Sequence, residues 1–278
     1  MRFFKEIVLA IFATVLVLIP SDVSAVEQSR VPQISAISAV LCDLDTGRTL
    51  YEKNPDKRIY PASTTKMMTC LLALEKSSPD SIVVANDDAA DVESTRIVAG
   101  QRFYMRDIIY QMMLISDNGA AIAIADKIGG SVSGFADMMN KKAALLGMTH
   151  THFVNPNGMP DTAHYTTARD MSILARACMQ HSAFRRIVGT KQRNVYLLTP
   201  SNRKNYCENT NELLYSYPGC TGIKTGWTRA AGGCLAASAS RNGRSLLVLV
   251  YHSDNEESRF DEAAALLDYG FSIDVNRK

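Results

Sequence analysis

The sequence contains a single tryptophan, and histidine is also scarce, with five residues among 278. The histidines form no recognisable ligand set, and isolated histidines usually make ordinary polar contacts. No Cys-x-x-Cys pair and no Cys/His spacing of the zinc-binding kind occurs. We therefore expect no metal site and no cofactor. The histidines are His150, His152, His164, His181 and His252.

An excess of one charge is lacking too, because 30 Lys and Arg residues balance 28 Asp and Glu residues. No basic cluster interleaved with aromatic residues appears, which argues against a nucleic-acid partner. The balance also argues against a strongly charged protein of the membrane surface. Since internal repeats and low-complexity linkers are absent from the sequence as well, we expect one continuous globular unit.

Long apolar runs occur only at the N-terminus. Two basic residues precede an apolar segment over residues 7–19, which is followed by the small-residue cleavage pattern Val23-Ser24-Ala25. This order is typical of a secretory signal peptide, predicted over residues 1–25, with an uncleaved anchor as the alternative. We expect residues 26–278 to be exported to the periplasm or cell wall, without a stable membrane anchor.

Six cysteines in an exported chain raise the question of disulfides. Buried free thiols are expected where cysteines lie in apolar patterns, at Cys42, Cys70 and Cys178. The remaining candidates for pairing are Cys207, Cys220 and Cys234. We predict a bridge between Cys207 and Cys220, which would close the loop before residue 224.

Three short motifs stand out, and the first is Ser63-Thr64-Thr65-Lys66 after Pro61-Ala62. If a helix begins at Ser63, Lys66 lies one turn further along the same face, with its amine within reach of the serine hydroxyl. That arrangement places a nucleophile beside a base. Alone, the pattern also fits a helix cap followed by a solvated lysine.

The other two motifs also have ordinary interpretations. Ser116-Asp117-Asn118-Gly119 lies between two helical stretches, where a capping loop is typical. Lys224-Thr225-Gly226 approaches a pair of strands and fits an edge strand with a solvated lysine. In the order S-x-x-K, S-D-N, K-T-G along one domain-sized chain, however, the three form the signature of class A β-lactamases and penicillin-binding proteins.

The chain resembles the low-molecular-weight penicillin-binding proteins that act as serine-type D-alanyl-D-alanine carboxypeptidases. The resemblance covers residues 37–271 and includes stretches 153–159 and 164–171. Asn157 replaces a histidine that many relatives carry, and Thr221 replaces a frequent aspartate. The resemblance implies removal of the terminal D-alanine from peptidoglycan stem pentapeptides through an acyl-enzyme, with β-lactams as covalent inhibitors.

Acyl transfer requires a nucleophile, a base, a proton donor for the leaving nitrogen and an oxyanion hole, and the sequence offers a candidate for each. Ser63 would be the nucleophile, and Lys66 its base, provided that burial or like charge lowers the lysine pKa enough for a neutral amine. Ser116 would pass the proton to the leaving nitrogen. The backbone N–H groups of Ser63 and Trp227 are the oxyanion donors that the resemblance implies.

Substrate binding is expected from residues around the same motifs. Asn118 offers an amide to the substrate peptide bond, while Lys224 and the Thr225 hydroxyl can bind the terminal carboxylate. Gly226 completes the third motif. Arg259 matches an arginine that relatives use for the carboxylate, with a surface arginine as the alternative.

Strand patterns occur near both ends of the chain and helical patterns between them. Strands are expected over residues 37–44, 49–53, 193–198, around 224, 234–240 and 246–251, and helices over 64–76, 105–114, 118–128, 135–146, 168–181 and 256–269. This order of strands and helices predicts an α/β (α+β) fold, with one antiparallel sheet built from both termini and a helical lobe inserted between them. The resemblance implies the same fold, that of the serine β-lactamases and transpeptidases. The cleft between sheet edge and lobe would hold the active site. The C-terminal β-domain and anchor helix of many relatives are expected to be missing.

Three alternative functions remain at this stage. A class A β-lactamase requires a Glu-x-x-Leu-Asn motif, but the only glutamates between the second and third motifs, Glu208 and Glu212, are not followed by Leu-Asn. A non-catalytic penicillin-binding sensor would be expected to lose one of the three motifs. A DD-endopeptidase would use the same residues and differ only in the shape of its cleft.

Overall fold

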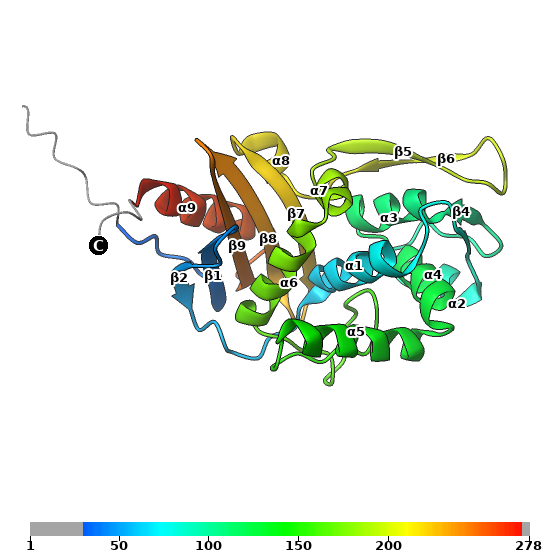
Figure 1. Ribbon diagram of the computed structural model, residues 1–278, viewed down its shortest axis with the longest axis horizontal. Helices are drawn as coiled ribbons and strands as arrows, with labels where there is room; N and C mark the ends of the chain where they lie inside the picture. Colours follow the sequence, from blue (N-terminus) through cyan, green and yellow to red (C-terminus); the bar gives the residue numbers. More distant parts are fainter. Residues whose placement is uncertain (1–29, 274–278) are drawn as a thin grey trace, which may run out of the picture.

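The computed structural model describes residues 30–273, so the predicted signal peptide lies outside the described residues (Figure 1). A five-stranded antiparallel sheet joins the two ends of this range, in the order β2-β1-β9-β8-β7. Its strands are β1 (Ser38–Asp43), β2 (Thr49–Lys53), β7 (Cys220–Thr228), β8 (Gly232–Arg241) and β9 (Arg244–Ser253). The predicted antiparallel sheet built from both termini is therefore confirmed.

The turn between β8 and β9 shows how the sequence sets the register of the sheet. Asn242 and Gly243 both have positive φ, 50° and 76°, as a two-residue turn of the right twist requires. Asparagine and glycine tolerate this conformation better than other residues. The turn pairs Arg241 with Arg244 and leads into the longest ladder of the sheet.

Alternating side chains of β9 face two different hydrophobic cores. Leu246, Val248 and Val250 pack toward α9 (Ser258–Ser272), which covers one face of the sheet. Leu247 and Leu249 pack on the opposite face, toward the helices. Because side chains of a strand alternate between faces, this period of two buries the central strand from both sides.

Helices between β2 and β7 form the helical lobe, which covers the second face of the sheet (Figure 1). They are η1 (Ala62–Thr65, a 3₁₀ turn), α1 (Lys66–Lys76), α2 (Asp87–Ala90), α3 (Met105–Leu114), α4 (Asn118–Gly129), α5 (Val132–Leu146), α6 (Ala168–Gln180), α7 (Ser182–Val188) and α8 (Leu213–Ser216). Helix α1 contacts α3, α4, α5, α6 and α7 and is largely buried. The two residues that begin this segment, Ser63 and Lys66, are thus held by the packed interior of the lobe.

Two short hairpins differ from the expected elements. β3 (Ile82–Val84) pairs with β4 (Arg102–Tyr104), and β5 (Gln192–Tyr196) pairs with β6 (Lys204–Glu208). Only β5 overlaps a predicted strand. β3 and β4 have three residues each and β6 is largely polar, so the sequence pattern does not reveal them. The predicted helix over 168–181 continues as α7 after a break at His181, whose ψ of 119° is extended.

The predicted bridge between Cys207 and Cys220 is wrong, because all six cysteines, which lie within residues 30–273, are free thiols. Cys207 lies on β6 and Cys220 at the start of β7, in two different sheets. Burial raises the pKa of the Cys207 thiol to about 11, so it stays protonated and unreactive at neutral pH.

Candidate active site

Ser63 and Lys66 lie three residues apart on one helical turn. Ser63 is in η1, which continues directly into α1, and Lys66 is the first residue of α1. Lys66 Nζ donates a hydrogen bond to Ser63 Oγ over 2.8 Å. The amine and the hydroxyl are in contact, although Ser63 lies in a 3₁₀ turn before the α-helix and does not begin the helix itself.

The Lys66 amine is fully buried and has three oxygen neighbours. Besides Ser63 Oγ, it donates to Asn118 Oδ1 (2.7 Å) and to the main-chain oxygen of Asn157 (2.8 Å). Burial lowers the pKa of Lys66 to about 7, against the opposite influence of the nearby Asp117 carboxylate. A large fraction of the amine is therefore neutral at neutral pH and able to accept a proton.

The buried carboxylate of Asp117 fixes the second motif by hydrogen bonds to several neighbouring segments. Its carboxylate caps α4 by accepting from the Ala120 N–H, and it also accepts from Thr95 Oγ1, the Arg96 N–H and Gln111 Nε2. Four such bonds satisfy a carboxylate that is almost completely buried. The next residue of the motif is thereby fixed at the start of α4.

Asn118 uses both ends of its amide within the protein. Its Oδ1 accepts from Lys66, and its Nδ2 donates to the main-chain oxygen of Glu93 over 2.9 Å. The amide thus holds the Lys66 amine in place, in addition to facing the cleft that Ser63 lines. Because both amide groups are engaged, binding of a substrate peptide bond by Asn118 requires a shared or exchanged hydrogen bond.

Two residues, one just before the first motif and one that begins the second, have left-handed backbones. Ala62, just before the nucleophile candidate, has φ 46°, and Ser116 has φ 60°. Such conformations are uncommon for residues other than glycine and concentrate at functional sites. The Ser116 and Ser63 side chains line one cleft.

Strand β7 forms the opposite wall and approaches Ser63 closely at Gly226. A Cβ atom at Gly226 would lie 2.9 Å from the Ser63 backbone nitrogen and 3.1 Å from Ala62 Cβ. Only glycine leaves room for this approach. The close packing brings the backbone of β7 beside the Ser63 N–H, and Trp227, half exposed, follows at the edge of the cleft.

Lys224 lies beneath the surface of this wall. Its side chain is 1% exposed, and Nζ donates to the main-chain oxygen of Thr225 over 2.8 Å. Burial, followed by the charges of Lys66 and Arg259, holds the pKa of Lys224 well below its usual range. The alternative interpretation of Lys224 as a solvated lysine on an edge strand is therefore wrong.

The end of the cleft near α9 carries Arg259, a threonine pair and Glu256. Arg259 is 6% exposed, and its guanidinium donates to the main-chain oxygen of Gly226 (2.9 Å) and to Glu256 (3.4 Å), so it is no surface arginine. The hydroxyls of Thr210 and Thr225 lie 2.6 Å apart. Together these groups offer a cation and two hydroxyl groups to an anionic end of a ligand.

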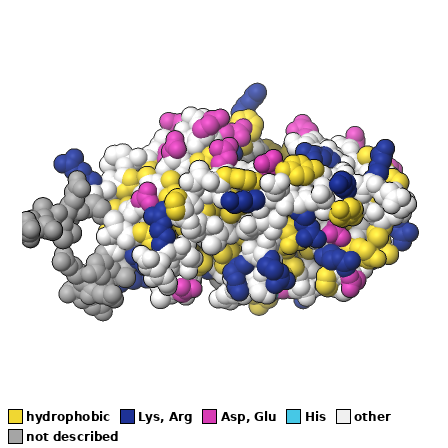
Figure 2. Space-filling model, turned by 90° about the horizontal axis from the view of Figure 1, so that it is seen from above, with side chains coloured by type: hydrophobic (Ala, Val, Ile, Leu, Met, Phe, Trp, Pro, Cys, Tyr) yellow, Lys and Arg dark blue, Asp and Glu magenta, His cyan; other side chains and the backbone are white. Residues whose placement is uncertain are grey.

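The cleft between the two walls has a volume of about 660 Å³ and continues into a second groove of about 620 Å³. The groove is lined by Glu208, Glu212 and Glu256, and acidic side chains gather around α8 in the view from above (Figure 2). The carboxylates surround the outer end of the site, whereas the buried ionisable side chains at its centre are the two lysines, Lys66 and Lys224.

Three groups of the site are not among those predicted from the sequence. They are the main-chain oxygen of Asn157, the main-chain oxygen of Glu93 and the Thr210 hydroxyl. Only the first lies in a stretch that the sequence singles out, 153–159. Since Asn157 contributes its backbone, its difference from a histidine leaves the contact with Lys66 intact.

His164 forms a hydrogen bond with Thr65, in the 3₁₀ turn that contains Ser63. The Val154 N–H donates to His164 Nδ1 (3.1 Å), so the proton lies on Nε2, which donates to Thr65 Oγ1 (2.9 Å). Burial lowers the pKa of His164 to about 4. The residue is a neutral, fully bonded polar group, in line with the ordinary interpretation of the histidines.

Within residues 30–273, no group of three or more His, Cys, Asp and Glu side chains is arranged to hold a metal ion. In the same range, no helix has the length and apolarity needed to cross a membrane.

Comparisons with known proteins agree with this geometry. The family model described as D-alanyl-D-alanine carboxypeptidase, Peptidase S11, matches residues 24–255. The carboxypeptidase DacF of Bacillus subtilis is 34% identical over 91% of this chain and 67% of its own length. A D-alanyl-D-alanine carboxypeptidase of Streptomyces sp. is 32% identical over 87% of this chain and 89% of its own.

A solved structure of a Streptomyces DD-transpeptidase superposes with a TM-score of 0.84 at 32% identity, over 88% of this chain and all of that one. The predicted β-lactamase/transpeptidase-like fold and the resemblance stated from the three motifs are both confirmed. The chain belongs to the D-alanyl-D-alanine carboxypeptidase family of serine hydrolases, Peptidase S11.

Proposed function

We propose that Ser63 is the acylated nucleophile of a D-alanyl-D-alanine carboxypeptidase and that neutral Lys66 is its base. One observation carries this assignment. Of the three oxygen neighbours of the Lys66 amine, two are carbonyl oxygens that only accept hydrogen bonds, on Asn118 and Asn157. A neutral amine has two N–H groups for these carbonyls, and its lone pair can then accept the proton of the third neighbour, the Ser63 hydroxyl. This reverses the direction of the hydrogen bond that the amine donates to Ser63 Oγ when it is charged.

The reaction then follows the usual course of acyl transfer. Ser63 Oγ attacks the carbonyl carbon of the penultimate D-alanine while its proton moves to Lys66. The oxygen that becomes negative lies between the backbone N–H groups of Ser63 and Trp227. Ser116 gives its hydroxyl proton to the leaving nitrogen and takes up the one held by Lys66, the terminal D-alanine departs, and water hydrolyses the ester, which restores the Ser63 hydroxyl.

Recognition of the free carboxylate is assigned to the wall formed by β7 and α9. The Thr225 and Thr210 hydroxyls and the Arg259 guanidinium line the cleft there, and Lys224 adds a buried amine directly beneath them. Gly226 permits the close approach to Ser63, and Asn118 faces the substrate backbone from the other wall. β-Lactams, which imitate the D-alanyl-D-alanine terminus, should acylate the same serine.

A family that acts on peptidoglycan works outside the cytoplasm. For this chain we propose export directed by residues 1–25, with residues 26–278 as one catalytic domain in the periplasm or cell wall.

The decisive test of substrate uses purified protein, a muropeptide pentapeptide and a cross-linked peptide dimer. Release of D-alanine from the pentapeptide, with the dimer intact, supports the carboxypeptidase. Splitting of the dimer at an equal or greater rate would assign an endopeptidase instead. Ser63→Ala serves as the inactive control, since its loss of both reactions shows that neither comes from a contaminant.

A further inference from the structure

A second cavity lies in the helical lobe, apart from the catalytic cleft. It has a volume of about 470 Å³ and is enclosed by the C-terminal half of α1, the start of α3, α7 and Arg193 of β5. It shares no lining residue with the cleft. Its size falls within the range of roughly 300–1,000 Å³ that is usual for small-molecule sites.

The floor of this cavity, called here the α7 cavity, is apolar. Ala73, Met105, Ile109 and Ile187 line it and are buried. Leu74 and the ring of Tyr110 extend the apolar wall. A ligand with an apolar body would bury its surface here.

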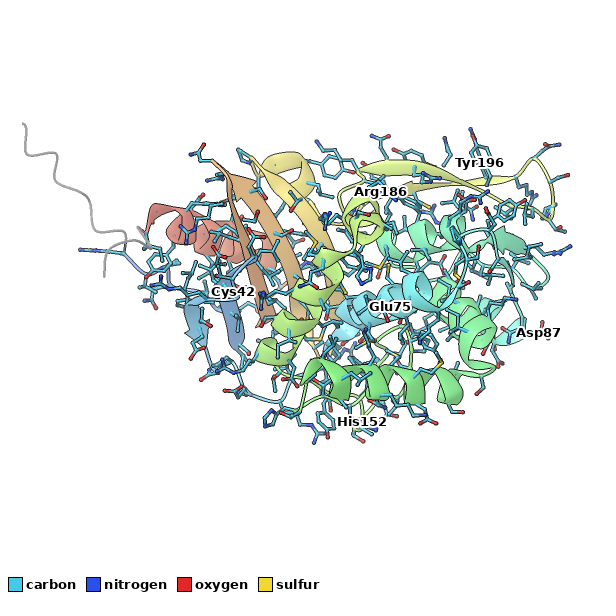
Figure 3. All side chains as sticks on the ribbon, viewed as in Figure 1. Cys42, Glu75, Asp87, His152, Arg186 and Tyr196 are labelled. Carbon is cyan, nitrogen blue, oxygen red and sulfur yellow. The ribbon has the colours of Figure 1, made fainter. Side chains whose placement is uncertain are left out.

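Every charged side chain that lines the α7 cavity is basic. Arg106 is paired with Asp80, Arg193 with Asp107 (3.3 Å), and His181 lies 3.7 Å from Glu75. The remaining one, Arg186, makes no side-chain hydrogen bond or ion pair among the residues of the range 30–273. Figure 3 shows Arg186 on α7 and Glu75 on α1.

Arg193 adds a second unused donor. Its guanidinium stacks over the Tyr110 ring at 4.1 Å, which leaves the buried Nε without a hydrogen-bond partner. An anionic oxygen in the cavity would satisfy donors of this kind. The view from above also shows Lys and Arg side chains spread over the half of the molecule that holds the helical lobe (Figure 2).

We propose that the α7 cavity binds a small anionic amphiphile, with its apolar body on the floor formed by α1 and α3 and its anionic head at Arg186 and Arg193. The site is independent of the acyl-transfer site. Shape and charge both argue for this class of ligand: the floor excludes a strongly hydrated ion, and the basic rim disfavours a cationic amphiphile.

A matched pair of fluorescent probes tests this proposal. 8-Anilinonaphthalene-1-sulfonate carries an anionic head, and N-phenyl-1-naphthylamine has nearly the same aromatic body without it. The protein should bind one equivalent of the sulfonate and should bind the neutral probe about fivefold more weakly, which is the contribution of one partly exposed ion pair. Equal affinity for the two probes, or no binding of the sulfonate, would overturn the proposal.

Three variants locate the binding. Arg186→Gln should weaken the sulfonate about fivefold and leave the neutral probe within twofold. Ala183→Trp, which places a large ring in the cavity, should weaken both probes at least tenfold. Arg203→Gln removes an exposed charge outside the cavity and should change neither. Thermal melting verifies that each variant is folded, and wild-type affinity in both Arg186→Gln and Ala183→Trp would place the probe elsewhere and refute the site.

Discussion

The two walls of the catalytic cleft each contain a buried lysine, but the amines have different neighbours. Lys66, on the helical wall, contacts the Ser63 hydroxyl and two carbonyl oxygens from distant segments. Lys224, on the sheet wall, contacts only the main-chain oxygen of its own neighbour Thr225 among the hydrogen bonds of residues 30–273. Burial lowers the pKa of both.

This difference divides the work of the site. In the proposed reaction, the helical wall places a proton acceptor against the reactive hydroxyl and carries the chemistry. The sheet wall, with its close backbone at Gly226 and its proposed anion-binding end, would position the substrate. Burial of a lysine is therefore not sufficient to make it a base; contact with a group that can give up a proton is also required.

The largest effect is expected when the base is removed. Lys66→Ala should lower the rate of acylation by penicillin about 10³-fold, because the Ser63 hydroxyl loses its one nearby proton acceptor. Stopped incubations followed by intact-mass spectrometry measure the rate. Lys76→Ala, at the exposed end of the same helix, should acylate as the wild type does. Acylation of Lys66→Ala at a near wild-type rate would assign the base elsewhere.

Removing the other lysine should cost less and depend on the substrate. Lys224→Ala should reduce kcat/KM for a peptide with a free terminal carboxylate by about 10- to 100-fold, since the buried amine that a bound carboxylate would hold in its charged form is lost. The matching peptide ester without that carboxylate should be affected much less. Lys191→Ala, an exposed lysine, is the control. Equal losses on both substrates would contradict the division between the walls.

The pH dependence of acylation reports directly on the helical wall. Because the pKa of Lys66 is lowered to about 7 and only the neutral amine accepts a proton, the rate should rise as pH increases through 7 and level off above it. Below pH 7 it should fall about tenfold per pH unit. Acylation rates measured between pH 5 and 9 check this. A rate that stays flat from pH 5 to 7 would mean that Lys66 is not the base.

The smallest effect concerns the threonine pair. Thr210→Val should lower kcat/KM for the free-carboxylate peptide about three- to tenfold, the contribution of one hydrogen bond, and should leave the ester unchanged. Thr210→Ser keeps the hydroxyl and should retain most of the activity. If Thr210→Ser loses as much as Thr210→Val, packing of the methyl group matters and carboxylate binding by the hydroxyl is refuted.

The sequence predicts those contacts of the site that form between residues close together along the chain. Ser63 and Lys66 meet because residues three apart in a helical turn share a face, and the sequence predicts this contact directly. The β8–β9 turn is equally local, since the two residues Asn242-Gly243 fit one turn geometry. Both features depend on only a few consecutive residues.

The remaining features depend on contacts between distant segments. The main-chain oxygens of Glu93 and Asn157 fix Asn118 and Lys66, but any residue has such an oxygen, so their residue types give no signal. The Thr210 hydroxyl reaches Thr225 from the connection between β6 and α8. Cys207 and Cys220 appear close in sequence, yet the separate hairpin formed by β5 and β6 places them in different sheets.

The central claim, that Ser63 is the nucleophile, is tested most directly by penicillin labelling. The wild-type protein should gain the mass of one penicillin molecule, peptide mapping should place the adduct on Ser63, and Ser63→Ala should gain none. Ser77→Ala, a half-buried serine just after α1 that does not line the cleft, should be labelled like the wild type. An unlabelled wild-type protein, or an adduct that persists in Ser63→Ala, would contradict the account.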